Sequence, residues 1–247
     1  MENGDECAET WNYASVVGML MYLSLNSRPD ITFAVNKCTR FMHKPKQVHE
    51  QAIKRIGRYL RGTAMDGMII KPDPSLKLDC FVDADFAGLW NYEDQHDSSS
   101  VKSCTGFVIT LGGTPVVWAS RLQSEIALST MEAEYIALST AMRDLLPMRS
   151  LLSELEEMRH IIQDPKSTVS TVWEDNQAAL TLANMELPRM TPRSKHIAVK
   201  YHWFRSKVQV GKIEIQAIES TNQVADIFTK GLRVDSFVRL RKMLAGW

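Results

Sequence analysis

Residues 105–142 read "TGFVITLGGTPVVWASRLQSEIALSTMEAEYIALSTAM" and contain the pattern that decides the fold. Two apolar runs rich in β-branched residues flank Gly112-Gly113, which is typical of a β-hairpin closed by a tight turn. The spacing then changes to apolar residues three and four positions apart, which predicts a long helix over 130–158. A hairpin followed by a long helix favours an α/β fold.

The same patterns extend to both sides of this stretch. Residues 11–62 have helical spacing throughout. Further strands are predicted in "SLKLDCFVDAD" (75–85), "STVSTVWED" (167–175) and "KIEIQAI" (212–218). Helices are predicted in "NQAALTLAN" (176–184), over 194–209, and from "NQVADIFTKGL" (222–232) to the end. The spacing of apolar residues changes from helical to strand-like near residue 70, so we expect a helical segment over 1–70 and an α/β domain over 71–247.

Composition excludes several classes of protein. The chain has 247 residues, of which 45% are apolar and 23% charged, as in ordinary soluble globular proteins. Its four cysteines form no C-x-x-C pair, which argues against a zinc site and for a reducing, intracellular environment. We see no signal peptide and no apolar run long enough to span a membrane.

The charges balance, but they are unevenly distributed. Lys+Arg and Asp+Glu each number 29. From Lys37 to Arg61 the chain carries one acid, Glu50, among many bases, and from Arg189 to Lys212 it carries bases and no acid. Such stripes can hold a polyanion. Each stripe taken alone is more typical of a solvated helix face.

Three aspartates lie at the ends of predicted elements. Asp83 is predicted to end the first strand and Asp175 the fourth, and Asp226 is near the start of the last helix. Sites in open α/β sheets form at the carboxyl ends of strands. Each position also has a structural interpretation: Asp83 as a turn acid, Asp175 as a helix N-cap, and Asp226 as a first-turn acid that the helix dipole stabilises.

Glu132 and Glu134 begin the long helix and have different expected roles. Ser129 and Glu132 have the S-x-x-E spacing of a capping box, in which Glu132 reaches back to the Ser129 amide. About 100° per residue places Glu134 nearer the apolar stripe of the helix. That stripe is Met131, Tyr135, Leu138, Met142 and Leu145. A carboxylate near a packed face is costly unless it is paired or metal-bound, so Glu134, rather than Glu132, is predicted to take part in the chemistry of a site.

Five stretches, in this order, resemble the ribonuclease H domain of copia-type LTR retrotransposon Pol polyproteins. They are "FVDADFAG" (81–88), residues 105–142, "EDNQAAL" (174–180), "RSKHIAVKYHWFR" (193–205) and "NQVADIFTKGL" (222–232). Residues 13–63, beginning "YASVVGMLMYLSL", resemble the end of the reverse transcriptase upstream of that domain. The resemblance covers about Tyr13 to Leu232.

The resemblance implies a ribonuclease H-like five-stranded mixed sheet flanked by helices, with an N-terminal helical segment. It implies that Asp83, Glu134, Asp175 and Asp226 bind two Mg²⁺ (or Mn²⁺) ions and cleave the RNA strand of RNA/DNA hybrids during reverse transcription. All-oxygen ligands suit these ions rather than zinc. The expected nucleic-acid-binding residues are Lys195, His196, Lys200, Arg205 and Lys207. The implied partners are the hybrid and the rest of a Pol polyprotein, in a cytoplasmic virus-like particle or the nucleus.

The sequence departs from the family pattern in three places. The loop "ESTNQ" (219–223) before Asp226 lacks the histidine that many ribonucleases H carry, and the nearest, His196 and His202, are interpreted as packed or phosphate-facing. The spacer "LWNYEDQHDSSSVK" (89–102) is longer than usual. No Tyr-x-Asp-Asp polymerase motif precedes the domain, so if this is the complete chain we expect no DNA polymerisation, and residues 1–70 would pack against or grip the duplex.

Three alternatives remain open at this point. One is a catalytically silent or host-adopted ribonuclease H-like domain that binds nucleic acid. Another is a different nuclease on the same fold, such as an integrase. The third is a structural or protein-interaction α/β domain, which would leave Glu134 and the acids at element ends unexplained.

Overall fold

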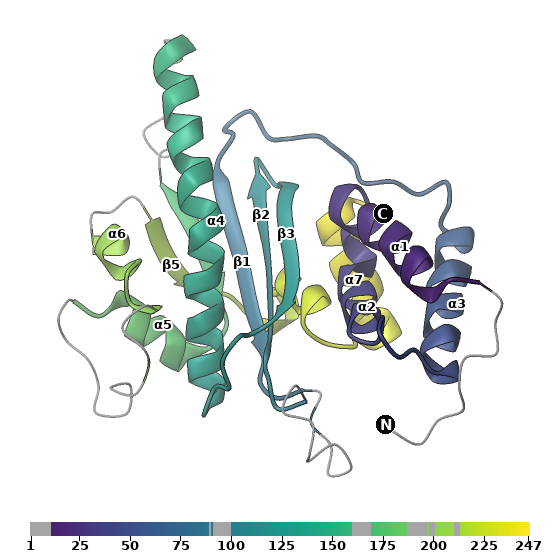
Figure 1. Ribbon diagram of the computed structural model, residues 1–247. Coiled ribbons are helices and arrows are strands. Elements are labelled where there is room, and N and C mark those ends of the chain that lie inside the picture. Colours follow the sequence, from purple (N-terminus) through teal and green to yellow (C-terminus); the bar gives the residue numbers. More distant parts are fainter. Residues whose placement is uncertain are drawn as a thin grey trace.

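A computed structural model describes residues 11–88, 90, 100–159, 169–186, 197, 201–209 and 213–247 (Figure 1). Its centre is a five-stranded sheet with the order β3-β2-β1-β4-β5. The strands are β1 (Leu78–Asp85), β2 (Cys104–Leu111), β3 (Thr114–Leu122), β4 (Ser170–Glu174) and β5 (Ile213–Ala217). β1, β2 and β3 pair antiparallel, whereas β4 and β5 add in parallel to β1. The predicted mixed five-stranded sheet is therefore confirmed.

The β2–β3 hairpin has the turn that its glycines predict. Gly112 and Gly113 have φ values of 53° and 77°, and glycine adopts such positive values without strain. A side chain at Gly112 would also meet the backbone of Asp73 at 2.6 Å. The turn thus fixes the hairpin register and lets the chain entering β1 lie against it.

Helix α4 (Thr130–Arg159) covers one face of the sheet (Figure 1). The predicted apolar stripe is confirmed, since Tyr135, Leu138, Met142 and Leu145 are fully buried against the sheet. Met131 is only half-buried at the rim of the same core. Two short helices, α5 (Gln177–Asn184) and α6 (Arg205–Gln209), pack beside β5 and complete this layer.

The N-terminal helices and the C-terminal segment lie on the other side of the β2–β3 hairpin (Figure 1). The N-terminal elements are α1 (Tyr13–Asn26), η1 (Pro29–Ile31), α2 (Thr32–Thr39) and α3 (Gln47–Gly62), and they share a small core of their own. The C-terminal elements are η6 (Ser220–Asn222), η7 (Val224–Phe228) and α7 (Val234–Ala245). Trp118 of β3 packs here, and its indole Nε1 donates to the Ser24 carbonyl at 2.7 Å.

Direct contacts cross the predicted boundary at residue 70. The Ile69 amide donates to the Ala245 carbonyl at 3.0 Å. Arg241 Nη1 donates to the Tyr59 hydroxyl at 3.2 Å, and the Tyr59 ring packs edge-on against Phe237 at 5.9 Å. The division into 1–70 and 71–247 stays a prediction, and α7 and β3 both contact the N-terminal part.

The predicted helix beginning at residues 222–232 is wrong in its extent. This stretch contains the end of the short 3₁₀ helix η6 and all of η7, and the closing helix α7 begins only at Val234, after an extended Arg233. Asp226 therefore lies in η7 rather than at the start of the last helix. Among the described residues, no helix combines the length and the apolar character needed to cross a lipid bilayer.

Candidate active site

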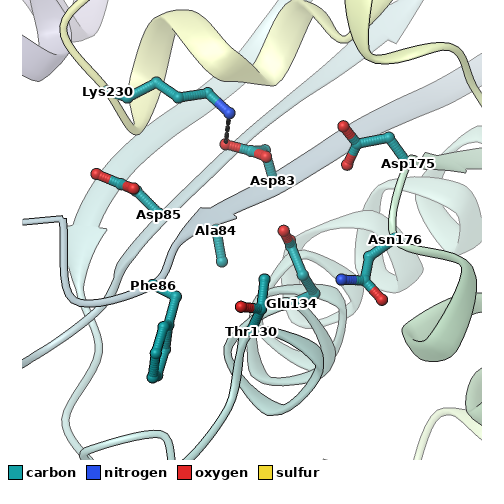
Figure 2. A pocket seen from close by; sticks show the side chains of 9 residues that line it. All are labelled: Asp83, Ala84, Asp85, Phe86, Thr130, Glu134, Asp175, Asn176 and Lys230. Carbon is teal, nitrogen blue, oxygen red and sulfur yellow. Dashed lines mark ion pairs between the residues drawn. The ribbon is translucent and has the colours of Figure 1, made fainter.

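Three of the predicted acids meet at one edge of the sheet. Asp83 lies near the end of β1 and is 2% exposed. Asp175 directly follows β4, the parallel neighbour of β1, so the two strands bring their carboxyl ends to the same edge. Glu134 enters from the first turns of α4. One carboxylate oxygen of each acid lies within 4.8 Å of the others, around a shared pocket (Figure 2).

The fourth predicted acid, Asp226, joins this group through a lysine. Asp226 is not among the three acids that meet within 4.8 Å. Its Oδ1 lies 2.7 Å from Lys230 Nζ, which also lies 3.5 Å from Asp83 Oδ2. Lys230 lines the pocket and points at Asp83 (Figure 2). The Thr229 hydroxyl also donates to Asp83 Oδ2.

Gly106 explains why η7 lies so close to Asp83. Gly106 on β2 pairs directly with Asp83. A Cβ at Gly106 would meet Phe228 Cβ at 2.7 Å, Thr229 Cγ2 at 2.6 Å and the Ala225 carbonyl at 3.1 Å. The missing side chain therefore leaves room for the segment that carries Asp226, Thr229 and Lys230.

Glu132 and Glu134 separate as the helix geometry predicts. The Ser129 hydroxyl accepts from the Glu132 amide at 3.2 Å, which is one half of the expected capping box. The other half differs, because Glu132 Oε2 accepts from the Leu128 amide at 2.8 Å rather than from Ser129. Glu134 instead faces the pocket, where it accepts from the Ala84 amide. Its Oε2 is buried and, within the described residues, has no hydrogen-bond partner.

Burial and mutual repulsion dominate the electrostatics of the site. Burial raises the pKa of Glu134 to about 11, and repulsion from Glu174 and Asp83 adds to the shift. Burial also raises the pKa of Asp83, although Lys230 and Thr229 counteract it. The pKa of Asp226 rises to about 7, chiefly through burial and then repulsion from Asp83, which together outweigh its ion pair with Lys230. The site therefore holds its negative charge at a high cost.

Around the end of β4, Asn176 caps α5 with its side chain, so the N-cap interpretation of Asp175 is wrong. Asp175 Oδ2 instead accepts from the Ser220 hydroxyl at 2.8 Å. The preceding Glu174 is fully buried and accepts from the Asn176 amide at 3.0 Å. Burial raises the pKa of Glu174 well above its usual range.

Sequence reasoning missed three residues of this site, namely Glu174, Thr229 and Lys230. Strand alternation in "STVWE" (170–174) could have found Glu174, since it lies on the same face as the buried Ser170 and Val172. The spacing from Asp226 to Lys230, four residues, was the available signal for an ion pair. No signal in the sequence marked Thr229.

The expected nucleic-acid-binding residues have mixed outcomes. Lys195, His196 and Lys200 lie outside the described residues. Lys207 is exposed on α6. Arg205 is fully buried and its Nη2 donates to the Met185 carbonyl at 2.6 Å, so it supports the fold and we leave it out of the proposed nucleic-acid surface.

His202 is a packed residue, one of its two predicted roles. It is buried, and its Nδ1 forms a hydrogen bond of 2.8 Å with the Tyr135 hydroxyl. The neighbouring Trp203 donates to the Ser139 hydroxyl at 3.0 Å. These contacts attach the segment before α6 to α4.

Curated relatives identify the family, although no protein-family model matches the chain. The chain is 35% identical over 236 residues to the retrovirus-related Pol polyprotein from transposon RE1 of Arabidopsis thaliana, which is 95% of this chain and 15% of that protein. It is 36% identical over 235 residues to the corresponding polyprotein from transposon TNT 1-94 of Nicotiana tabacum, covering 95% and 16%. The chain belongs to the copia-type, retrovirus-related Pol polyproteins of transposons, and it spans about 15% of the length of these relatives.

One structural neighbour is LC11-RNase H1, solved in complex with an RNA/DNA hybrid. It is 16% identical in sequence and has a TM-score of 0.40, over 62% of this chain and 94% of that chain.

We expect Gly106→Ala to displace η7 and loosen the site. The added methyl group would press on the Ala225 carbonyl and on Phe228 Cβ, neither of which is the end of a flexible side chain. The cost should be about 1–3 kcal/mol in the free energy of unfolding, as for an overpacked core. Urea denaturation measures it. Gly57→Ala on α3 is the matched control, because its Cβ would meet nothing within 4 Å, and it should stabilise the fold slightly. Equal stability of the two variants would show that η7 does not depend on Gly106.

We expect Asp226→Asn to change how stability depends on pH when no divalent metal is present. Unfolded Asp226 ionises near its ordinary pKa of 3.8, whereas folded Asp226 ionises near 7. Between these values unfolding releases a proton, so the wild-type free energy of unfolding falls as pH rises through this window. The asparagine side chain of the variant carries no such proton, so its free energy of unfolding should fall less steeply. Thermal melting at pH 4.5, 6 and 8 in EDTA tests this, and parallel curves for the two proteins would contradict it.

Proposed function

We propose that this chain is a metal-dependent endonuclease that cleaves the RNA strand of RNA/DNA hybrids. The observation that carries the proposal is the convergence of Asp83, Glu134 and Asp175 at the carboxyl edge of the sheet. Three ionisable acids that repel one another there serve no evident structural purpose. Membership of the retrovirus-related Pol polyprotein family supports the same activity. We propose that the cleavage takes place during reverse transcription.

The donor set fits a hard divalent cation such as Mg²⁺ or Mn²⁺. Every candidate ligand is a carboxylate oxygen, and the buried Glu134 Oε2 has no hydrogen-bond partner among the described residues. Asp83, Glu134 and Asp175 would hold the cation, with Asp226 as the fourth acid nearby. When bound, a pair of such ions supplies a nucleophile at neutral pH and stabilises the charge on the leaving oxygen.

The protein's own groups hold these acids in place. The Ala84 amide donates to Glu134, the Thr229 hydroxyl donates to Asp83, and the Ser220 hydroxyl donates to Asp175. Each carboxylate thereby keeps one oxygen occupied by a donor from a different element. All three acids line the pocket, so they are oriented before substrate arrives.

We place part of the nucleic-acid surface on α2 and β3, beside the acids. In the sheet, Asp83 pairs with Gly106 and Gly106 with Ser120, so Ser120 lies two strands, or about 10 Å, from Asp83. Asn36 of α2 donates to the Ser120 carbonyl at 2.8 Å, which attaches α2 to this end of the sheet. Lys37 on α2 and Arg121 on β3 are both exposed there.

The charge of Lys37 reaches the site. Burial raises the pKa of Asp85, next to the pocket acids, and the positive charge of Lys37 opposes this rise. Cations a strand or two from the acids can bind phosphates that flank the cleavage position. Part of the first basic stripe, from Lys37 to Arg61, is thus proposed to face the substrate, together with the exposed Lys207.

We expect Glu134→Gln to abolish cleavage and Glu132→Gln to preserve it. Even partners of metal ligands typically contribute 10–100-fold, so loss of a ligand should cost more than about 100-fold in rate. In Glu132→Gln the amide oxygen of the new side chain can still accept from the Leu128 amide, so this variant is the matched control. Cleavage of a labelled RNA/DNA hybrid with Mg²⁺, Mn²⁺ or EDTA measures the effect. Normal cleavage by Glu134→Gln would refute the assignment, whereas hybrid binding without cleavage by the wild type would indicate a silent binding domain.

We expect Lys37→Ala combined with Arg121→Ala to weaken hybrid binding and to reduce its salt dependence. Each lost phosphate contact removes about 0.9 from the slope of log K against log salt, so the double variant should lose about 2. Fluorescence anisotropy at several salt concentrations gives the slope. Arg239→Ala combined with Lys242→Ala, on the exposed face of α7, removes the same charge elsewhere and should leave the slope nearly unchanged. If the two double variants have the same slope of log K against log salt, the substrate binds on another surface.

A further inference from the structure

Lys230 connects acids that come from two parts of the chain. Its Nζ lies 2.7 Å from Asp226 Oδ1 and 3.5 Å from Asp83 Oδ2. Both partners are far more buried than the lysine, with side chains 13% and 3% exposed against 38% for Lys230. The ammonium group therefore contacts two carboxylates that have little access to water, although the lysine side chain itself is partly exposed.

The charge on Lys230 acts on the whole acid cluster. It opposes the burial that raises the pKa of Asp83, of Asp226 and of Asp85. Burial by itself would lower the pKa of Lys230, but attraction from Asp83, Asp226 and Asp175 outweighs it, and the pKa is raised. Lys230 thus remains charged and is the cation that these acids share.

We propose that Lys230 is a built-in counter-ion that holds Asp83 and Asp226 together in the metal-free protein and is displaced when a divalent cation binds. This inference rests on the proposed metal-dependent function. An ammonium group and a divalent cation repel each other strongly when they share one carboxylate, so both cannot keep their closest positions. The four-carbon side chain of lysine allows the ammonium group to move outward.

Two measurable properties follow for the metal-free and metal-bound protein. Without metal, Lys230 lowers the repulsion among the acids and stabilises the fold. With metal, part of the binding free energy is used to displace Lys230, so the lysine weakens metal affinity. A cation that only paired with surface acids would have the first effect and not the second.

The test is Lys230→Met, which keeps an unbranched side chain as far as the ε carbon and removes the ammonium group and its charge. In EDTA at pH 8 we expect the variant to melt at a lower temperature than the wild type, and saturating Mg²⁺ should close most of that gap. Isothermal titration calorimetry with Mn²⁺ on the full chain should show about tenfold tighter binding, the equivalent of about 1.4 kcal/mol. Lys242→Met on α7 is the matched control and should leave Mn²⁺ affinity unchanged.

Three results would overturn the inference. An equal loss of melting temperature with and without Mg²⁺, together with unchanged Mn²⁺ affinity, would make Lys230 an ordinary structural ion pair. Weaker Mn²⁺ binding by Lys230→Met would make it a supporting partner of the bound metal. If Lys230→Met does not fold, Lys230→Arg is the second test, because it keeps the positive charge in a bulkier group. We expect Lys230→Arg to retain the stability of the metal-free protein and to shift Mn²⁺ affinity by less than about threefold. A larger shift would contradict displacement of the charge as the cause. No Mn²⁺ binding by the wild type would refute the proposed function itself.

Discussion

Repulsion among buried carboxylates is the constraint on which the rest of this structure depends. Asp83 and Glu134 are almost completely buried, and Asp175 lies beside them. A cluster of buried carboxylates destabilises the fold or takes up protons unless the surrounding elements supply hydrogen-bond donors and positive charge. The chain supplies them from distant places: an amide from β1, hydroxyls from η6 and from the residue after η7, and the ammonium group of Lys230. The arrangement of layers around the sheet is what brings these groups to one edge.

The parts that the sequence predicted are those governed by local rules. The glycine pair specifies the hairpin turn because glycine adopts positive φ values without strain, and the apolar spacing of α4 selects the face that packs on the sheet. Helix geometry also separated Glu134 from Glu132 before any family was considered. The choice of Asp226 came from the resemblance, and its position next to Asp83 depends on a contact between residues far apart in sequence.

The parts that were missed depend on tertiary packing. Residues 222–232 have a helical composition, yet only the short 3₁₀ helix η7 and the last residue of η6 are helical here, and η7 with the residue after it lies directly on Gly106. Arg205 has the sequence context of a phosphate ligand, but it is drawn inside by main-chain carbonyls of the segment after α5. Glu132 bonds to the Leu128 amide because the chain before the helix turns differently from a standard capping box. Propensity cannot specify such contacts, since each depends on what a distant segment places nearby.

The close packing of η7 on Gly106 also sets an order of events during synthesis. Asp83 bonds to Thr229, which follows it by 146 residues, and Lys230 comes one residue later. At a translation rate of about 5–20 residues per second, Asp83 is made roughly 7–30 s before its counter-ion. Through that interval the strand carrying Asp83 and Asp85 has neither Lys230 nor Thr229 beside it. Assembly of the acid cluster is therefore a late step of folding, and a nascent chain stalled before η7 carries Asp83, Glu134 and Asp175 without Thr229 and Lys230.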